Sequence, residues 1–242
     1  MWAVFKKEVN IFFSSLIGYI AIGVFLIANG LIVWVLPESN VFDFGYATLQ
    51  ELFTIAPWVF MFLIPALTMR FFAEEHQTGT LEFLATKPLT DYQIISGKYL
   101  AGLTLVIFSI LPTLVYFFTI HELAAPRGNV DFGGTWGSYL GLLFLGSAYV
   151  SIGMFASAIT NNQIISFILG MFLCFVFYLL LDWIRDFALV GMIDPILEHL
   201  SIQTHYQSIS RGVLDTRDLV YFVSFNVFFL ALTKTVIESR KW

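Results

Sequence analysis

The run Ile164–Leu181, IISFILGMFLCFVFYLLL, decides the fold of this chain. None of its 18 residues is Asp, Glu, Lys, Arg or His. A helix needs about 20 predominantly apolar residues to cross the hydrocarbon core of a bilayer. Five other stretches approach that length, so the sequence predicts six spans, at residues 16–36, 53–72, 95–120, 136–159, 164–183 and 217–237. We therefore expect an all-α, polytopic membrane protein made of one domain, residues 1–242.

The composition of the chain agrees with lipid as its main solvent. Hydrophobic residues make up 58% and charged residues 12%, against roughly 25% charged residues in average usage. The net charge of -5 and the scattered 12 basic residues provide no surface for a nucleic acid. The single cysteine, Cys174, excludes an intrachain disulfide and a cysteine-based metal site.

The Lys and Arg residues between the expected spans predict the orientation, because cytoplasmic loops carry an excess of them. With both termini in the cytoplasm, four of these residues lie outside: Arg127, Arg185, Arg211 and Arg217. Eight lie inside: Lys6, Lys7, Arg70, Lys87, Lys98, Lys234, Arg240 and Lys241. The bias favours this orientation.

The cytoplasmic segment 73–94 predicts an elbow between the second and third spans. Gly79 permits a sharp turn, and Thr80 can cap a short helix that Pro88 ends. Thr90 and Gln93 then have the spacing of a capping box for the next helix. Apolar side chains held at this surface require a protein partner or the bilayer interface.

The external segment 184–216 is the second connection with structure of its own. Asp194 followed by Pro195 predicts the start of a short amphipathic helix over 196–202, lying at the outer interface. Gly212 is a candidate C-cap, and Asp215 can cap the last span. The polar residues of this region form a motif of unknown role: His205, Tyr206, Ser208, Ser210, Arg211, Gly212, Asp215, Arg217 and Asp218.

Two interpretations of that motif remain open. Arg211 and Arg217 could contact an anionic substrate or lipid headgroups, or they could pair locally with Asp215 and Asp218. The small residues of the fourth span leave a similar choice, because they allow close helix approach either inside the bundle or at a seam between subunits. These small residues include Gly137, Gly141, Gly146, Gly153, Ser151 and Ser157.

The sequence predicts no catalytic residue, cofactor site or metal site on this chain. It has no phosphate-binding loop and no His-Glu-x-x-His run. The middle parts of the expected spans carry no ionisable residue, which argues against a proton-coupled or ion-coupled transporter.

The segment 74–90, EEHQTGTLEFLATKPLT, with Gly97-Lys98 beyond it, resembles the permease subunits of ABC-2 type transporters. Three other stretches narrow the resemblance: KKE at 6–8, HYQSISRGVLDTRD at 205–218 and ESRKW at 238–242. With them, the whole chain resembles the gliding-motility-associated permeases of Bacteroidetes, the GldF subunits. His76-Gln77 departs from the basic residues that related chains often carry there, so the charge complementarity with an ATPase stays open.

The resemblance implies a permease of the bacterial inner membrane that acts with a separate ABC ATPase subunit, on which ATP and magnesium bind. It implies an N-terminal interfacial helix within 1–15 and a dimeric permease, formed with a companion permease that has a large external domain or with a second copy. It assigns coupling to the ATPase to the elbow, at Glu74, Glu75, Gly79, Thr80, Leu81, Glu82 and Pro88.

Two other functions remain possible on the sequence alone. The first is a membrane anchor or assembly subunit of a motility or secretion machine, without transport, because no span carries an identifiable substrate site. The second is a membrane-embedded enzyme, which would need a polar pocket that unites His121, Asp182 and His205.

Overall fold

The computed structural model describes residues 1–37, 40–80, 90–186 and 194–239, and within them the chain is helical without strands. Helices follow from the apolar runs, because a backbone in lipid must satisfy its polar groups within its own segment. The prediction of an all-α membrane protein is confirmed. The helices are α1 (Trp2–Ser14), α2 (Leu16–Trp34), α3 (Val41–Phe44), α4 (Gln50–Thr68), α5 (Arg70–Gln77), α7 (Asp91–Ile110), α8 (Leu114–Leu123), α9 (Phe132–Ile159), α10 (Gln163–Phe175), α11 (Leu181–Asp186), α12 (Asp194–Leu200), α13 (Ile202–Ser210) and α14 (Thr216–Ser239).

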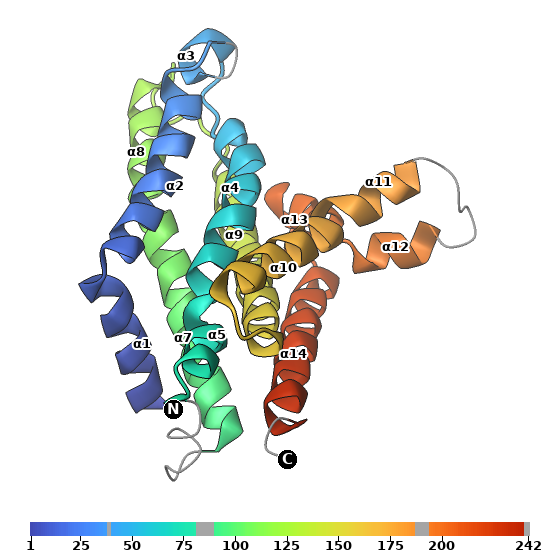
Figure 1. Cartoon of the computed structure of the whole chain (residues 1–242). Helices are drawn as coiled ribbons and strands as arrows, with labels where there is room; N and C mark the ends of the chain where they lie inside the picture. The colour runs from blue at the N-terminus through green and yellow to red at the C-terminus, as the bar shows by residue number, and fades with distance from the viewer. Residues whose placement is uncertain (38–39, 81–89, 187–193, 240–242) are drawn as a thin grey trace.

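Among the described residues, five helical stretches are long and apolar enough to span a membrane: Gln50–Gln77, Asp91–Leu123, Phe132–Ile159, Gln163–Arg185 and Thr216–Ser239. The first helices supply a sixth span only if α1 and α2, which meet at an angle of 67°, count as one unit. Figure 1 shows the start of α1 and the end of α14 at the same end of the molecule as α5 and the start of α7.

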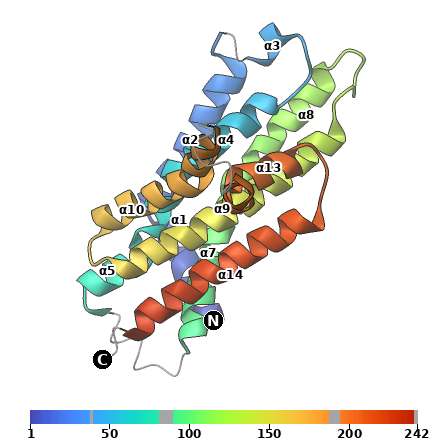
Figure 2. The same cartoon turned by 90° about the vertical axis from the view of Figure 1, so that its right-hand side faces the viewer.

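Helix α9 is the centre of the bundle. It packs against α4, α5, α7, α10, α13 and α14 (Figure 2). Its most apolar stretch is 78% buried, against 28% for the corresponding stretch of the last span. The small residues of α9 therefore pack inside the chain: Gly137 and Gly141 lie against α13, Gly146 against Val106 of α7, and Gly153 against Thr68 of α4.

Two spans contain breaks that the sequence analysis did not predict. A 3-10 turn, Leu111–Thr113, joins α7 to α8. Pro112 lies in this turn and lacks the N–H that a continuous helix would need. A π-helix, Val176–Leu180, joins α10 to α11, and such a segment shifts the side chains that follow it to a different face.

The structure has a short external helix, α12, that starts at Asp194 as the sequence suggested, and it adds a second helix, α13, that the sequence analysis did not predict. Ile202, Tyr206 and Ile209 form a buried stripe on α13. This stripe packs on the glycines of α9, so α13 lies against the bundle. Local signals alone could not reveal this packing.

Several turn and cap predictions are confirmed. Thr90 and Gln93 form both bonds of a capping box at the start of α7. Gly212 has φ +83, as a left-handed C-cap requires. Asp215 Oδ1 accepts from the Arg217 N–H at 2.9 Å and so caps α14.

Replacing Gly137 with Ala should weaken the packing of α13 on α9. The new Cβ would lie 2.5 Å from the Ile209 carbonyl oxygen and 2.8 Å from the Gly212 Cα, both backbone atoms that cannot rotate away. We expect a loss of about 1–3 kcal/mol of unfolding free energy, measured by thermal unfolding of the detergent-solubilised protein.

Gly23→Ala in α2 is the matched control, because no atom lies within 4 Å of its added Cβ. This variant should match the parent or gain up to about 1 kcal/mol from higher helix propensity. Equal unfolding temperatures for the two variants would contradict the close contact of α13 with α9.

Candidate functional site

The first candidate site begins where α4 gives way to α5. The first N–H groups of a helix have no hydrogen-bond acceptor within the helix. In α5, Ser157 of α9 provides the acceptor. Its Oγ accepts from the N–H groups of Phe72 and Ala73, at 2.9 and 3.0 Å, and donates to the Met69 carbonyl oxygen at 2.9 Å. The start of α5 is therefore fixed to the central helix.

A buried ammonium group then joins α5 to two other helices. Lys98 of α7 is 1% exposed, and its Nζ lies 2.7 Å from Glu8 Oε1 of α1 and 2.9 Å from Glu75 Oε1 of α5. The same Nζ donates to the Phe71 carbonyl oxygen at 2.6 Å. The half-exposed Lys7 adds a second contact to Glu75 Oε1, at 2.9 Å. We call Lys7, Glu8, Glu75 and Lys98 the inner charge cluster.

The inner charge cluster balances two cations with two carboxylates. Burying a charge is costly unless it is paired and hydrogen-bonded, and the three contacts of Lys98 Nζ supply that pairing. The rings of Phe71 and Phe72 also face the ammonium group, with centroids 5.9 and 5.1 Å away. The cluster therefore holds α1, α5 and the start of α7 together only while all partners are present.

The predicted coupling residues divide around this cluster. Glu75 faces inward, whereas Glu74 is more exposed and pairs with Arg70 at 3.0 Å along α5. Gly79 has φ +68, which a turn favours. The Thr80 hydroxyl lies 2.9 Å from that of Thr78. The other predicted positions, Leu81, Glu82 and Pro88, lie outside the described residues.

Sequence reasoning missed Lys98 and Glu8, although a helical pattern marks both. Val4, Glu8 and Phe12 follow at four-residue spacing, and all three are buried on one face of α1. Lys98 shares a buried face with Ile94, Ala101 and Leu105 of α7. A charged residue inside an apolar stripe of this kind indicates a buried ion pair.

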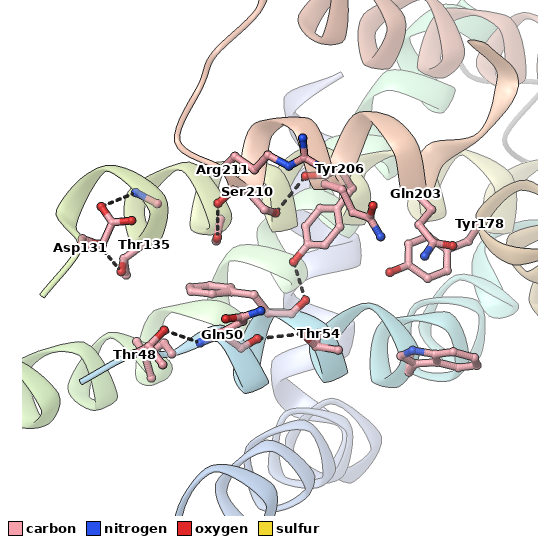
Figure 3. Close-up of a pocket in the computed structure, with 16 residues that line it drawn as sticks. Thr48, Gln50, Thr54, Asp131, Thr135, Tyr178, Gln203, Tyr206, Ser210 and Arg211 are labelled. Atoms are coloured by element: carbon pink, nitrogen blue, oxygen red, sulfur yellow. Dashed lines mark hydrogen bonds between the residues drawn. The ribbon is translucent and has the colours of Figure 1, made fainter. Parts of the chain in front are cut away.

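The second candidate site is a pocket of about 460 Å³ between α4, α9 and α13. Figure 3 shows Thr48, Gln50 and Thr54 on one wall, and Gln203, Tyr206 and Arg211 on the opposite wall. Asp131 and Thr135 lie at one end, and Tyr178 of the π-helix lies near the other. We call this the outer pocket.

The predicted external motif is split by the structure. Tyr206, Ser210 and Arg211 line the outer pocket, and the Tyr206 hydroxyl donates to the Phe53 carbonyl oxygen at 2.6 Å. His205 Nδ1 instead lies 2.6 Å from Asp218 Oδ1, and its ring stacks on Tyr221. Ser208 accepts the Arg211 N–H through its backbone oxygen.

The local pairing of Arg211 and Arg217 with Asp215 and Asp218 does not occur. Asp218 pairs with His205, and Asp215 caps the backbone of α14. In the described part of the chain, no ion pair or side-chain hydrogen bond holds the guanidinium group of Arg211, which is exposed at the outer pocket. Because the Arg211 guanidinium group has no such partner among the described residues, contact with an anionic group is the interpretation of Arg211 that stays open.

Comparison with known families identifies the class of protein. A family model described as "ABC-2 family transporter protein" matches residues 27–238. The chain belongs to the ABC-2 transporter family. No curated protein matches it in a search. This ABC-2 chain is thus a multi-pass permease component of an ABC transporter, a class that works with an ABC ATPase subunit.

The geometry of the ABC-2 chain does not assemble the enzyme site that was considered from the sequence. Asp182 accepts from Ser201 at 2.5 Å and from Thr204 at 3.2 Å, while His205 pairs with Asp218. His121 lies at the end of α8, 3.6 Å from Glu122. Within the described ranges, no group of three or more His, Cys, Asp or Glu residues is placed to hold a metal ion.

Replacing Lys98 with Met should destabilise the permease strongly. Glu8 and Glu75 would remain buried without their shared cation, and breaking a buried pair in this way costs about 3–5 kcal/mol. The measurement is the temperature at which the detergent-solubilised chain loses its monodisperse elution peak.

Lys6→Met is the control for this substitution, because Lys6 lies on α1 but is exposed and outside the inner charge cluster. It should unfold at the temperature of the parent. A Lys98→Met variant as stable as Lys6→Met would refute the structural role of the cluster.

Proposed function

We propose that this ABC-2 permease component couples ATP hydrolysis on a separate ABC ATPase subunit to the movement of a substrate across the bacterial inner membrane. ATP and magnesium bind on the ATPase, and segment 73–94 is the coupling elbow that receives its motion. The permease pairs with a companion permease that has a large external domain, or with a second copy of itself.

One observation carries this proposal: the inner charge cluster ties together both helices that flank the elbow. Glu75 lies on α5, in the first residues of the elbow, and Lys98 lies on α7, just after the elbow. Their contact at 2.9 Å closes the base of the elbow. A force on the elbow would therefore move α5 and the start of α7 as one unit.

The same contacts supply a route from the elbow into the membrane. Glu8 adds α1 to the unit, so the N-terminal helix would follow the elbow. Ser157 connects the start of α5 to α9, the most buried helix. α4 and α5 together form the apolar stretch Gln50–Gln77, so a shift of α5 would also act on α4.

An association with gliding motility is the finer part of the proposal. It is supported by the stretches KKE at 6–8, HYQSISRGVLDTRD at 205–218 and ESRKW at 238–242, which resemble motility-associated permeases. Two of these stretches take part in the sites described above: Glu8 belongs to the inner charge cluster, and Arg211 lies at the outer pocket.

Charge reversal in the elbow, Glu82→Lys, should uncouple the transporter. We expect the stimulation of ATP hydrolysis by the permease to fall at least about tenfold, because a misplaced charge at a docking surface costs on the order of 1.4 kcal/mol or more. Leu84→Pro should act in the same way by preventing the helix expected there. The measurement is the ATPase rate of the reconstituted complex.

Glu198→Lys, a reversal at an exposed position of α12 and outside the elbow, is the control and should leave stimulation unchanged. Membrane insertion of each variant is checked by its elution profile. Full ATPase stimulation and unchanged co-purification in the Glu82→Lys variant would defeat the coupling proposal. Constant ATPase activity without any transported species would favour the anchor function.

A further inference from the structure

An apolar groove lies next to the outer pocket, and one side chain lines both. Trp58 of α4 is 40% exposed and belongs to the wall of each cavity. The groove has a volume of about 530 Å³ and lies between α2, α4 and α10, where Ile20, Phe62, Ala66 and Phe167 line it. The outer pocket is therefore polar, and the groove beside it is apolar.

The outer pocket has side chains that can bind hydroxyl groups and one negative charge. Thr48, Thr54 and Gln50 offer hydroxyl and amide groups from α4 and the residues before it, and Gln207 offers an amide from α13. Arg211 supplies a guanidinium group that no carboxylate neutralises in the described residues, and such a group binds phosphate oxygens in a forked geometry. Asp131, the carboxylate that lines the outer pocket, caps α9, where it accepts from the Gly134 N–H at 3.0 Å.

The π-helix gives independent support for a ligand site. It lies in the fifth span at Val176–Leu180 and places Tyr178 in the wall of the outer pocket. A π-helical segment costs stability relative to a regular helix, and such segments concentrate at functional sites.

We propose that the outer pocket and the groove bind one amphiphile, with an anionic, hydroxyl-bearing headgroup in the pocket and a hydrocarbon chain in the groove. Trp58 lines both parts, and an indole, which has an apolar ring and one polar N–H, suits a boundary between a hydrocarbon chain and a headgroup. The inference rests on the proposed function, because it names the substrate class of the permease.

The groove is suited to a hydrocarbon chain because its walls carry almost no polar group, and because it opens beside exposed apolar residues such as Ile20 and Phe62. A chain of the ligand could enter from the bilayer without crossing water. The headgroup could then reach the hydroxyl and amide groups of the outer pocket, which a purely apolar ligand would leave unpaired.

The test measures lipid binding to the intact permease–ATPase complex by native mass spectrometry. The probe is dioleoyl phosphatidylglycerol, whose headgroup has two hydroxyl groups and one negative charge. Dioleoyl phosphatidylcholine has the same chains and the same phosphate, but it carries a quaternary ammonium group in place of the two hydroxyl groups, so its headgroup has no net charge. We expect the parent complex to bind phosphatidylglycerol about tenfold more tightly, the ratio that one charge-assisted contact of the headgroup would give.

Two pairs of variants separate the headgroup site from the chain site. Arg211→Gln should reduce the preference to about twofold, and Arg217→Gln, an external arginine outside the pocket, should keep it. Ala66→Trp fills the groove and should weaken binding of both lipids at least about fivefold, whereas Ala231→Trp, on an exposed face of α14, should not.

Four results would overturn the proposal: no preference in the parent, an Arg211→Gln variant that keeps it, tight binding of glycerol 3-phosphate without chains, or a second copy of the chain that covers the groove and is lost in Ala66→Trp. ATPase stimulation is measured on the same preparations. A parent complex that shows no lipid preference but full ATPase stimulation would refute this inference alone. A parent complex in which the permease does not stimulate the ATPase would refute the proposed function.

Discussion

The pairing of one buried ammonium group is the constraint on which the packing of α1, α5 and α7 in this permease depends. Burying the charged Lys98 is costly unless carboxylates neutralise it, and Glu8 and Glu75 come from two other helices. This requirement brings the N-terminal helix, the end of the second span and the start of the third span to one point. The elbow between these spans therefore begins and ends on a closed, rigid base.

The two candidate sites lie on the same long element. The stretch Gln50–Gln77 carries Gln50 and Thr54 at the outer pocket and Glu75 at the inner charge cluster. At 1.5 Å per residue, such a stretch covers about 40 Å. The same element thus connects the end that receives a force to the end that holds a ligand, and Ser157 fixes the break at Met69 to α9.

The sequence predicted what depends on local chemistry. The apolar runs determine where helices form, since lipid requires satisfied backbone groups, and Thr90, Gln93, Gly212 and Asp215 act as the caps that their side chains and backbone freedom suggest. It did not predict what depends on long-range packing. The position of α13 requires the glycines of α9, and the burial of Lys98 requires partners at positions 8 and 75.

The most direct test of the closed base is a distance measurement by pulsed electron paramagnetic resonance. Spin labels at Asn10 on α1 and Gln77 on α5, both exposed, report whether these helices move together in the permease–ATPase complex. The account predicts one narrow distance that is the same without nucleotide and with a trapped ATP analogue, while the distance from Gln77 to Ser239 on α14 changes. A distance between Asn10 and Gln77 that differs between the two states would contradict the account.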